Sequence, residues 1–157
     1  MRTAFVILFG IFTAGATFAA DSSLSLQTID SWVIVCDPAA TESEKHAASE
    51  FQKLYAGLTG KTLVIADTAG PSDGYIAIGP DAAVKSGLAP VDAGAGEETL
   101  RITTATNHIC IDGGRPRGTL YGVYEFFEEL CGVRYLTHDH TRYPDDSSSL
   151  RFPLGEH

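Results

Sequence analysis

Two arginines in a glycine-rich turn are the side chains best suited to hold an anion. Arg115 and Arg117 stand within the run Gly113–Gly118, between an apolar stretch and a helix-like stretch. A guanidinium holds a carboxylate through two parallel hydrogen bonds, so either arginine is a candidate partner for an acidic sugar or for a protein carboxylate. We favour the protein carboxylate, within the domain or across a domain boundary. The glycines match neither Gly-x-Gly-x-x-Gly nor a Walker loop, so the turn is a weak nucleotide signal.

Hydrolysis of a glycosidic bond uses two carboxylates that face each other across that bond. Glu128 and Glu129 are adjacent on a predicted helix and therefore point in different directions. The other acidic neighbours are Glu97-Glu98 at a strand start and Asp145-Asp146 in a polar stretch. The chain also has no Gly-x-Ser-x-Gly elbow for a serine nucleophile. On its own residues the chain does not have the features of a complete enzyme, and we assign it no catalytic residue.

The histidines and aromatic residues offer a metal hypothesis and a sugar-stacking hypothesis. His138-Asp139-His140 alternates like a metal site, but two ligands without a third make a poor one, so we expect a polar surface turn, no metal and no cofactor. Five aromatic side chains are candidates to stack on a sugar, and most of them fall on apolar faces: Trp32, Tyr75, Tyr121, Tyr124 and Tyr135. Tyr121 lies off the apolar stripe of its helix, so we expect it to be the exposed one.

The elements that position these residues follow from hydrophobic spacing. Strands are predicted over 31–36, 62–66, 75–79, 98–104 and 108–112, the last two as a hairpin, with a short extended segment over 133–136. A helix begins at the Thr41-x-x-Glu44 capping box and ends at Gly60; a short one passes through 82–84; a long one spans 118–131. This order predicts an α+β fold: a single sheet, mixed or mostly antiparallel, with helices packed mainly on one face.

The two ends of the chain differ from its middle in composition. Residues 1–19 show one charge at Arg2, an apolar run and then small residues, which is typical of a signal peptide; cleavage after Ala16 is the alternative to cleavage after Ala19. The apolar run falls short of the roughly 20 residues of a membrane span. We therefore predict a secreted or periplasmic protein, with no membrane attachment after cleavage. The folded domain is predicted over 20–144, and the polar segment 145–157 reads as a linker toward a missing domain.

The net charge bears on which macromolecules the chain can bind, and the cysteine content bears on whether it forms a disulfide. The formal net charge of −9 argues against nucleic acid, which requires clustered Lys and Arg. Three cysteines occur in apolar contexts, at Cys36, Cys110 and Cys131. One disulfide with one thiol left over is an open alternative in an oxidising compartment, but we favour three buried free thiols.

The chain resembles the small domain that precedes the catalytic barrel in α-glucuronidases of glycoside hydrolase family 67, and the second domain of β-N-acetylhexosaminidases. The most specific piece is the run from Arg117 to Phe126, Arg-Gly-Thr-Leu-Tyr-Gly-Val-Tyr-Glu-Phe. Further similar pieces are the helix Ala48–Tyr55, the strand Ile76–Gly79 and the exit Gly132–Thr137. The match extends over nearly all of the chain after residue 19. It departs at His138, where such domains have proline.

The resemblance implies a hexosaminidase domain 2-like fold and a role in polysaccharide and carbohydrate breakdown. A C-terminal catalytic barrel would be the partner of this domain and would carry the catalytic carboxylates, so none of these can be placed on the present residues. An oligosaccharide is the second candidate partner, with Arg115, Arg117 and Tyr121 as candidate residues for ligand binding or interdomain contact. Two roles follow from this: a structural support for a barrel, or a free-standing carbohydrate-binding module.

Overall fold

The computed structural model describes residues 23–70, 74–92, 94–137 and 139–157, so the predicted signal peptide, residues 1–19, lies outside the described residues. The strands are β1 (Ser23–Ser25), β2 (Val33–Cys36), β3 (Val64–Ala66), β4 (Tyr75–Ile78), β5 (Leu100–Thr104), β6 (His108–Gly113), β7 (Arg134–Thr137), β8 (His140–Arg142), β9 (Arg151–Pro153) and β10 (Gly155–Glu156). The helices are α1 (Leu26–Ile29), α2 (Glu42–Thr59), α3 (Pro80–Lys85), α4 (Gly118–Glu125) and the π-helical turn η1 (Phe126–Leu130).

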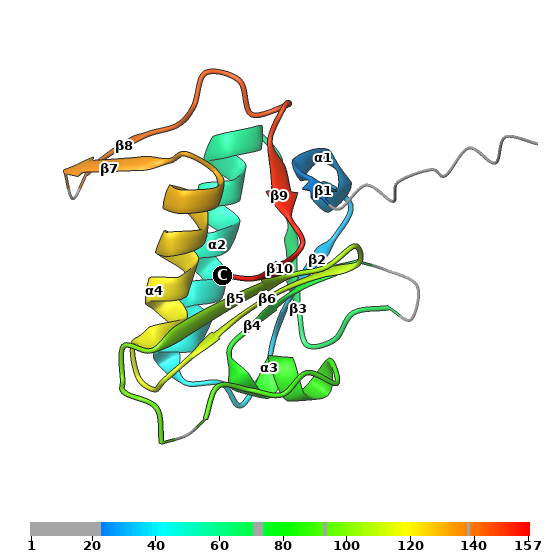
Figure 1. The fold of residues 1–157 in the computed structure, drawn as a ribbon, viewed down its shortest axis with the longest axis vertical. Helices are drawn as coiled ribbons and strands as arrows, with labels where there is room; N and C mark the ends of the chain where they lie inside the picture. The colour runs from blue at the N-terminus through cyan, green and yellow to red at the C-terminus, as the bar shows by residue number, and fades with distance from the viewer. Residues whose placement is uncertain (1–22, 71–73, 93, 138) are drawn as a thin grey trace, which may run out of the picture.

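A six-stranded mixed sheet in the order β10-β5-β6-β4-β2-β3 forms the centre of the molecule (Figure 1). Strands β3, β2, β4 and β6 are parallel to one another, and β5 joins β6 as the predicted antiparallel hairpin. The predicted α+β class with a mixed sheet is confirmed, and parallel pairing predominates in its central part. Parallel strands need a long crossover connection, and here α2 lies between the parallel neighbours β2 and β3, while α3 lies between β4 and β6.

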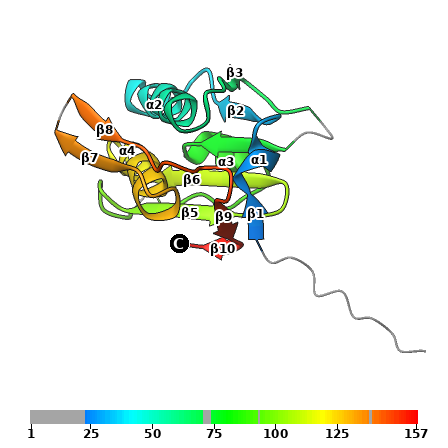
Figure 2. The ribbon, with the colours of Figure 1, turned by 90° about the horizontal axis from the view of Figure 1, so that it is seen from above.

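Two cores lie on the two faces of this sheet. Helices α2 and α4 lie side by side over one face (Figures 1 and 2), where they enclose the larger core, which includes Phe51, Phe126 and Phe127. The smaller helix α3 covers the opposite face through Ala82 and Ala83. The helices therefore lie mainly on one face, as predicted. The alternation of side chains along β4 and β6 supplies both cores, since successive residues point to opposite faces.

Helix α2 begins and ends where the sequence predicts. The Thr41 hydroxyl accepts from the Glu44 amide at 3.3 Å, and the Glu44 carboxylate accepts from the Thr41 amide at 2.8 Å, which completes the capping box. Gly60 ends the helix in the left-handed region at φ 73°. The predicted helix over 118–131 is observed as α4 followed directly by η1, whose wider turn brings both Phe126 and Phe127 into the core.

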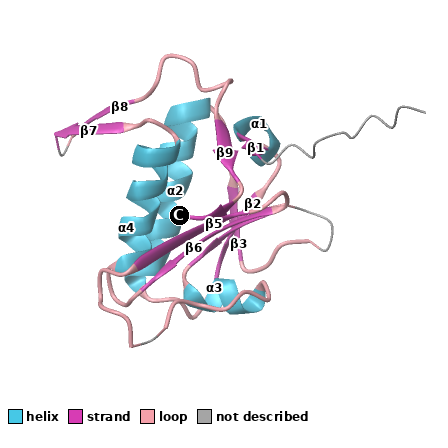
Figure 3. Cartoon of the chain, viewed as in Figure 1, coloured by secondary structure: helices cyan, strands magenta, loops and turns pink. Residues whose placement is uncertain are grey.

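The terminal segment is part of the fold, which corrects the predicted linker over 145–157 from Arg151 onward. Strand β9 pairs with β1, which lies beside it in Figure 3, and β10 pairs with β5 at the edge of the main sheet. Phe152 is fully buried and its ring packs against Phe126, with ring centroids 5.4 Å apart. The correction has a physical cause: short strands of two or three residues carry little local signal and are stabilised here by partners more than fifty residues away.

Candidate functional site

The glycine turn connects the end of β6 to the start of α4 and packs against backbone carbonyl groups of the segment that precedes β5. The Gly114 amide donates to the Thr99 carbonyl at 2.8 Å. A methyl group on Gly118 would overlap the same carbonyl, and one on Gly114 would overlap the carbonyl of Gly96. These carbonyl oxygens carry partial negative charge and would repel a phosphate or carboxylate on this side of the turn. The turn is therefore a packing device, in agreement with its weak nucleotide signal.

Arg115 joins the glycine turn to the starts of two helices. Its Nε donates to Glu44 Oε1 at 2.8 Å, and its Nη2 pairs with Asp81 on α3. The Glu44 side chain is 2% exposed, whereas that of Arg115 is 46% exposed. The hydrogen bond to Glu44 raises the pKa of Arg115 above its ordinary value. Because Glu44 also closes the capping box, Arg115 secures the start of α2, and its guanidinium is already engaged by protein carboxylates.

Arg117 lies on the surface beside two acidic residues. Its Nη2 is 3.3 Å from Glu97 Oε2 and 3.3 Å from Glu98 Oε1, and its side chain is 51% exposed. Exposed pairs of this kind contribute about 0–1 kcal/mol. Arg115 and Arg117 thus use different carboxylates within this domain. Tyr121, on α4, is exposed as predicted.

A groove lined by tyrosines lies where α2 and α4 meet the β7–β8 hairpin, the arm that extends beyond the helices in Figures 1 and 2. Its volume is about 410 Å³. We call it the tyrosine groove; its lining residues are Glu50, Lys53, Leu54, Tyr124, Tyr135, Thr137, Thr141 and Tyr143. The sequence marks Tyr124 and Tyr135 as aromatics able to stack on a sugar, and the structure brings these two together.

The polar groups of the tyrosine groove are connected to one another. The Tyr124 hydroxyl donates to Glu50 Oε2 at 3.3 Å, and Lys53 Nζ is 3.2 Å from Glu50 Oε1. The Tyr124 and Tyr135 rings meet edge to face, with centroids 5.3 Å apart. Burial, and then the Glu50 carboxylate, raise the pKa of Tyr124, and burial raises the pKa of Tyr135. Both phenols therefore stay neutral hydrogen-bonding groups at physiological pH.

The sequence reasoning missed Tyr143, Glu50 and Lys53. Gly57 on α2 makes room for Tyr143, because a methyl group at Gly57 would overlap the Tyr143 hydroxyl. This glycine within a helical pattern is the local signal of a close approach, but nothing in the sequence identifies the residue that approaches it.

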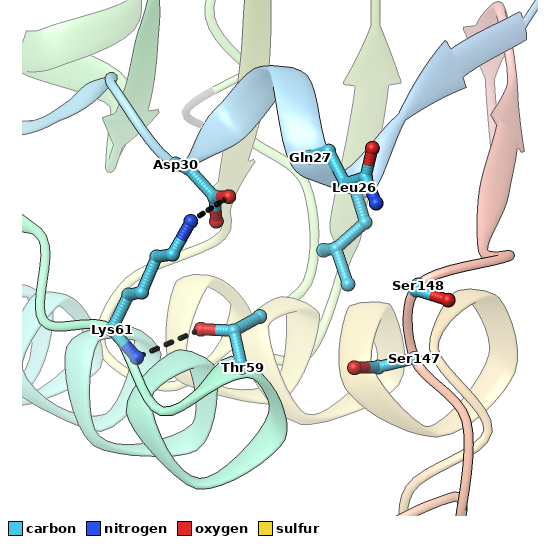
Figure 4. Close-up of a pocket in the computed structure, with 7 residues that line it drawn as sticks. All are labelled: Leu26, Gln27, Asp30, Thr59, Lys61, Ser147 and Ser148. Carbon is cyan, nitrogen blue, oxygen red and sulfur yellow. Dashed lines mark hydrogen bonds and ion pairs between the residues drawn. The ribbon is translucent and has the colours of Figure 1, made fainter.

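A smaller hollow of about 160 Å³ lies where α1, the end of α2 and the segment around Ser147 meet (Figure 4). Asp30 and Lys61 form an ion pair across it, and the Tyr55 hydroxyl donates to Asp30 Oδ1 at 2.7 Å. The Ser147 hydroxyl donates to the Leu58 carbonyl at 3.0 Å. Ligand pockets have volumes of about 300–1,000 Å³. This hollow is a junction between segments rather than a ligand site.

The remaining sequence candidates contribute no reactive site among the described residues. Cys36, Cys110 and Cys131 are buried free thiols, the alternative that we favoured. Burial raises the pKa of Cys110 to about 12, so this thiol stays protonated near neutral pH. His140 is exposed, while His138 lies outside the described residues. The described ranges hold no group of three or more metal-binding side chains and no helix long and apolar enough to cross a membrane.

Comparison with known proteins finds similarity among solved structures alone. The chain matches no family model and no curated protein. Among solved structures it is similar to "Structure of CpGH84D", a glycoside hydrolase family 84 protein, with a TM-score of 0.48 and 13% sequence identity. The similar region covers 66% of this chain and 18% of that chain, so this chain corresponds to a small part of that longer protein.

Proposed function

We propose that this chain is a non-catalytic N-terminal accessory domain of a secreted glycoside hydrolase of the α-glucuronidase type. It would support or position a catalytic barrel that follows it, in the breakdown of polysaccharides. The resemblance of the run Arg117–Phe126 to such domains motivates this proposal. The signal-peptide pattern of residues 1–19 motivates a secreted or periplasmic location.

The observation that carries the proposal is the close packing of the run Arg117–Phe126 against the sheet. Gly118 lies against the Thr99 carbonyl, and Gly122 lies so close to β6 that an added methyl group would be 2.8 Å from Ile111 Cγ2. Val123 and Phe126 are fully buried. The glycines and the buried apolar residues of this run therefore maintain a scaffold, as a supporting domain requires.

The contacts of three acidic residues support the proposal that this domain is non-catalytic. Glu44 is held by Arg115 and the capping box, and Glu97 and Glu98 share Arg117. Each of these carboxylates is engaged in a contact within the domain instead of facing its counterpart across an open cleft, as the pair of a glycosidase does.

A second candidate function is that of a free-standing carbohydrate-binding module. The tyrosine groove favours it, because aromatic faces beside a few convergent polar groups are typical of small-molecule sites. Like a supporting domain, a carbohydrate-binding module would catalyse no reaction. Unlike a supporting domain, it would have to bind a ligand.

Hydrolysis assays test the non-catalytic claim. We expect the purified chain to leave a glucuronosyl-xylotriose and 4-nitrophenyl N-acetyl-β-glucosaminide uncleaved over days. Enzyme-dependent release of glucuronic acid or nitrophenol would contradict the proposal. In that case the variants Glu44→Gln and Glu50→Gln would show whether either buried or half-buried carboxylate is responsible.

A further inference from the structure

We infer that the tyrosine groove is a binding site for a neutral pyranoside unit of an oligosaccharide. This inference rests on the second candidate function, whose ligand class it names, and it is independent of the proposed support of a barrel, since a module with or without a following domain can hold a sugar. It rests on the shape of the groove, on its hydrogen-bonding groups and on its charge balance.

The shape of the groove suits one or two sugar rings. Its volume of about 410 Å³ falls within the range of roughly 300–1,000 Å³ that small-molecule sites occupy. Its walls come from separate elements: Tyr124 from α4, Tyr135 from β7, and Tyr143 just after β8. Aromatic rings carry negative charge on their faces, and the faces of a pyranose ring carry C–H groups. Tyrosines half-exposed in a concave wall therefore complement a sugar better than they complement bulk water.

The hydrogen-bonding groups suit the hydroxyls at the edge of such a ring. A carboxylate has about four acceptor positions, and Glu50 uses three of them for Lys53 and Tyr124. The Glu50 side chain is 14% exposed, so it keeps access to the groove with one position still open. Thr137 donates to Asp139 at 2.6 Å, which leaves its hydroxyl oxygen free to accept. The groove thus offers two acceptors to the hydroxyls of a sugar, the Glu50 carboxylate and the Thr137 hydroxyl oxygen.

The charge balance selects a neutral ligand over an acidic one. Among the lining residues, Glu50 and Lys53 carry the charges, and they neutralise each other as an ion pair. An anionic sugar would meet no unpaired cation there, and the chain as a whole carries a formal charge of −9. Neutral hydroxyls, by contrast, gain a charge-assisted hydrogen bond to Glu50 without disturbing the ion pair.

Titration of the ¹⁵N-labelled chain, followed by amide chemical shifts, tests the inference. The probes are cellohexaose, xylohexaose and chitohexaose, each raised to about 10 mM, which detects dissociation constants of about 1 mM or lower. We expect at least one to shift the amides of Tyr135, Thr137 and Thr141 in a saturable manner. Absence of shifts with all three, or shifts confined to residues outside the groove, would overturn the inference.

A pair of matched variants assigns the binding to the groove. Glu50→Gln keeps the shape of the side chain and should weaken binding about tenfold, since one charge-assisted hydrogen bond is lost. Glu42→Gln is the control: it lies on the same helix, pairs with a lysine three residues on, and is 92% exposed outside the groove. We expect it to bind like the unchanged chain. Equal affinities of the two variants would overturn the role of the groove.

Discussion

At the scale of single residues, Glu44 is where the glycine turn, α2 and α3 are held together. Its carboxylate accepts from the Thr41 amide and from the Arg115 guanidinium while being 2% exposed. A buried carboxylate that loses its cation keeps its desolvation cost without compensation. Arg117 provides the contrast, because its acidic partners remain in water.

The two arginines of the turn should therefore differ in their effect on stability. We expect Arg115→Ala to lower the free energy of unfolding by about 2–3 kcal/mol, below the full value for a buried pair because Arg115 is half-exposed. Arg117→Ala should cost about 0.5 kcal/mol or less. Urea denaturation monitored by circular dichroism measures both. Equal losses would show that Glu44 does not depend on Arg115.

At the scale of elements, the approach of α4 to the β5–β6 hairpin depends on glycine. Gly118 and Gly113 allow the turn to lie against the backbone at Thr99, with an added methyl group on Gly113 only 2.5 Å from the Thr99 carbonyl oxygen. Backbone atoms cannot rotate away as a side chain can. The spacing between α4 and the hairpin is thus set by the missing side chains.

Substitution of Gly118 tests this spacing. We expect Gly118→Ala to destabilise the fold by about 2–3 kcal/mol through overpacking. Gly94→Ala is the control, since its methyl group would meet only the Asp92 carboxylate at 3.4 Å, and we expect a change within about 0.5 kcal/mol. Thermal and urea unfolding measure the stability of both variants. If Gly118→Ala is as stable as the unchanged chain, α4 can move away from the hairpin and the glycine does not set the spacing.

The end of the chain belongs to the same scale. Phe152 on β9 is fully buried beside Phe126, whereas its neighbour Arg151 is exposed. We expect Phe152→Ala to cost about 3–5 kcal/mol, as for other buried aromatic residues. Arg151→Ala should stay within about 0.5 kcal/mol. If both variants unfold at the same urea concentration, the segment behaves as the linker that its composition suggests, not as a strand of the fold.

At the scale of the whole molecule, the features with local causes could be predicted. The capping box and Gly60 correctly predict where α2 begins and ends. The strands predicted over 98–104 and 108–112 form the β5–β6 hairpin, as expected. The strands at the two ends escaped prediction. Ser23 pairs with Pro153, which lies near the other end of the sequence. The residues next to Ser23 contain no pattern that predicts so distant a strand partner.

The candidate sites, too, could be predicted only where their residues show a local pattern in the sequence. The sequence singles out Arg115, Arg117 and Tyr121, and the structure engages both arginines in ion pairs within the domain. The tyrosine groove could be predicted only in part: Tyr124 and Tyr135 are candidates from the sequence, whereas Glu50 reaches the groove from α2, 74 residues before Tyr124. A groove made by three separate segments has no linear pattern.

The central claim, a supporting domain of a longer secreted glycoside hydrolase, is tested most directly by reading the source transcript beyond the codon for His157. The account predicts that the reading frame continues into alternating strand and helix patterns of a (βα)₈ barrel, with two acidic residues at the carboxyl ends of its strands. A stop codon immediately after His157 would contradict the claim and leave the carbohydrate-binding module as the function to pursue.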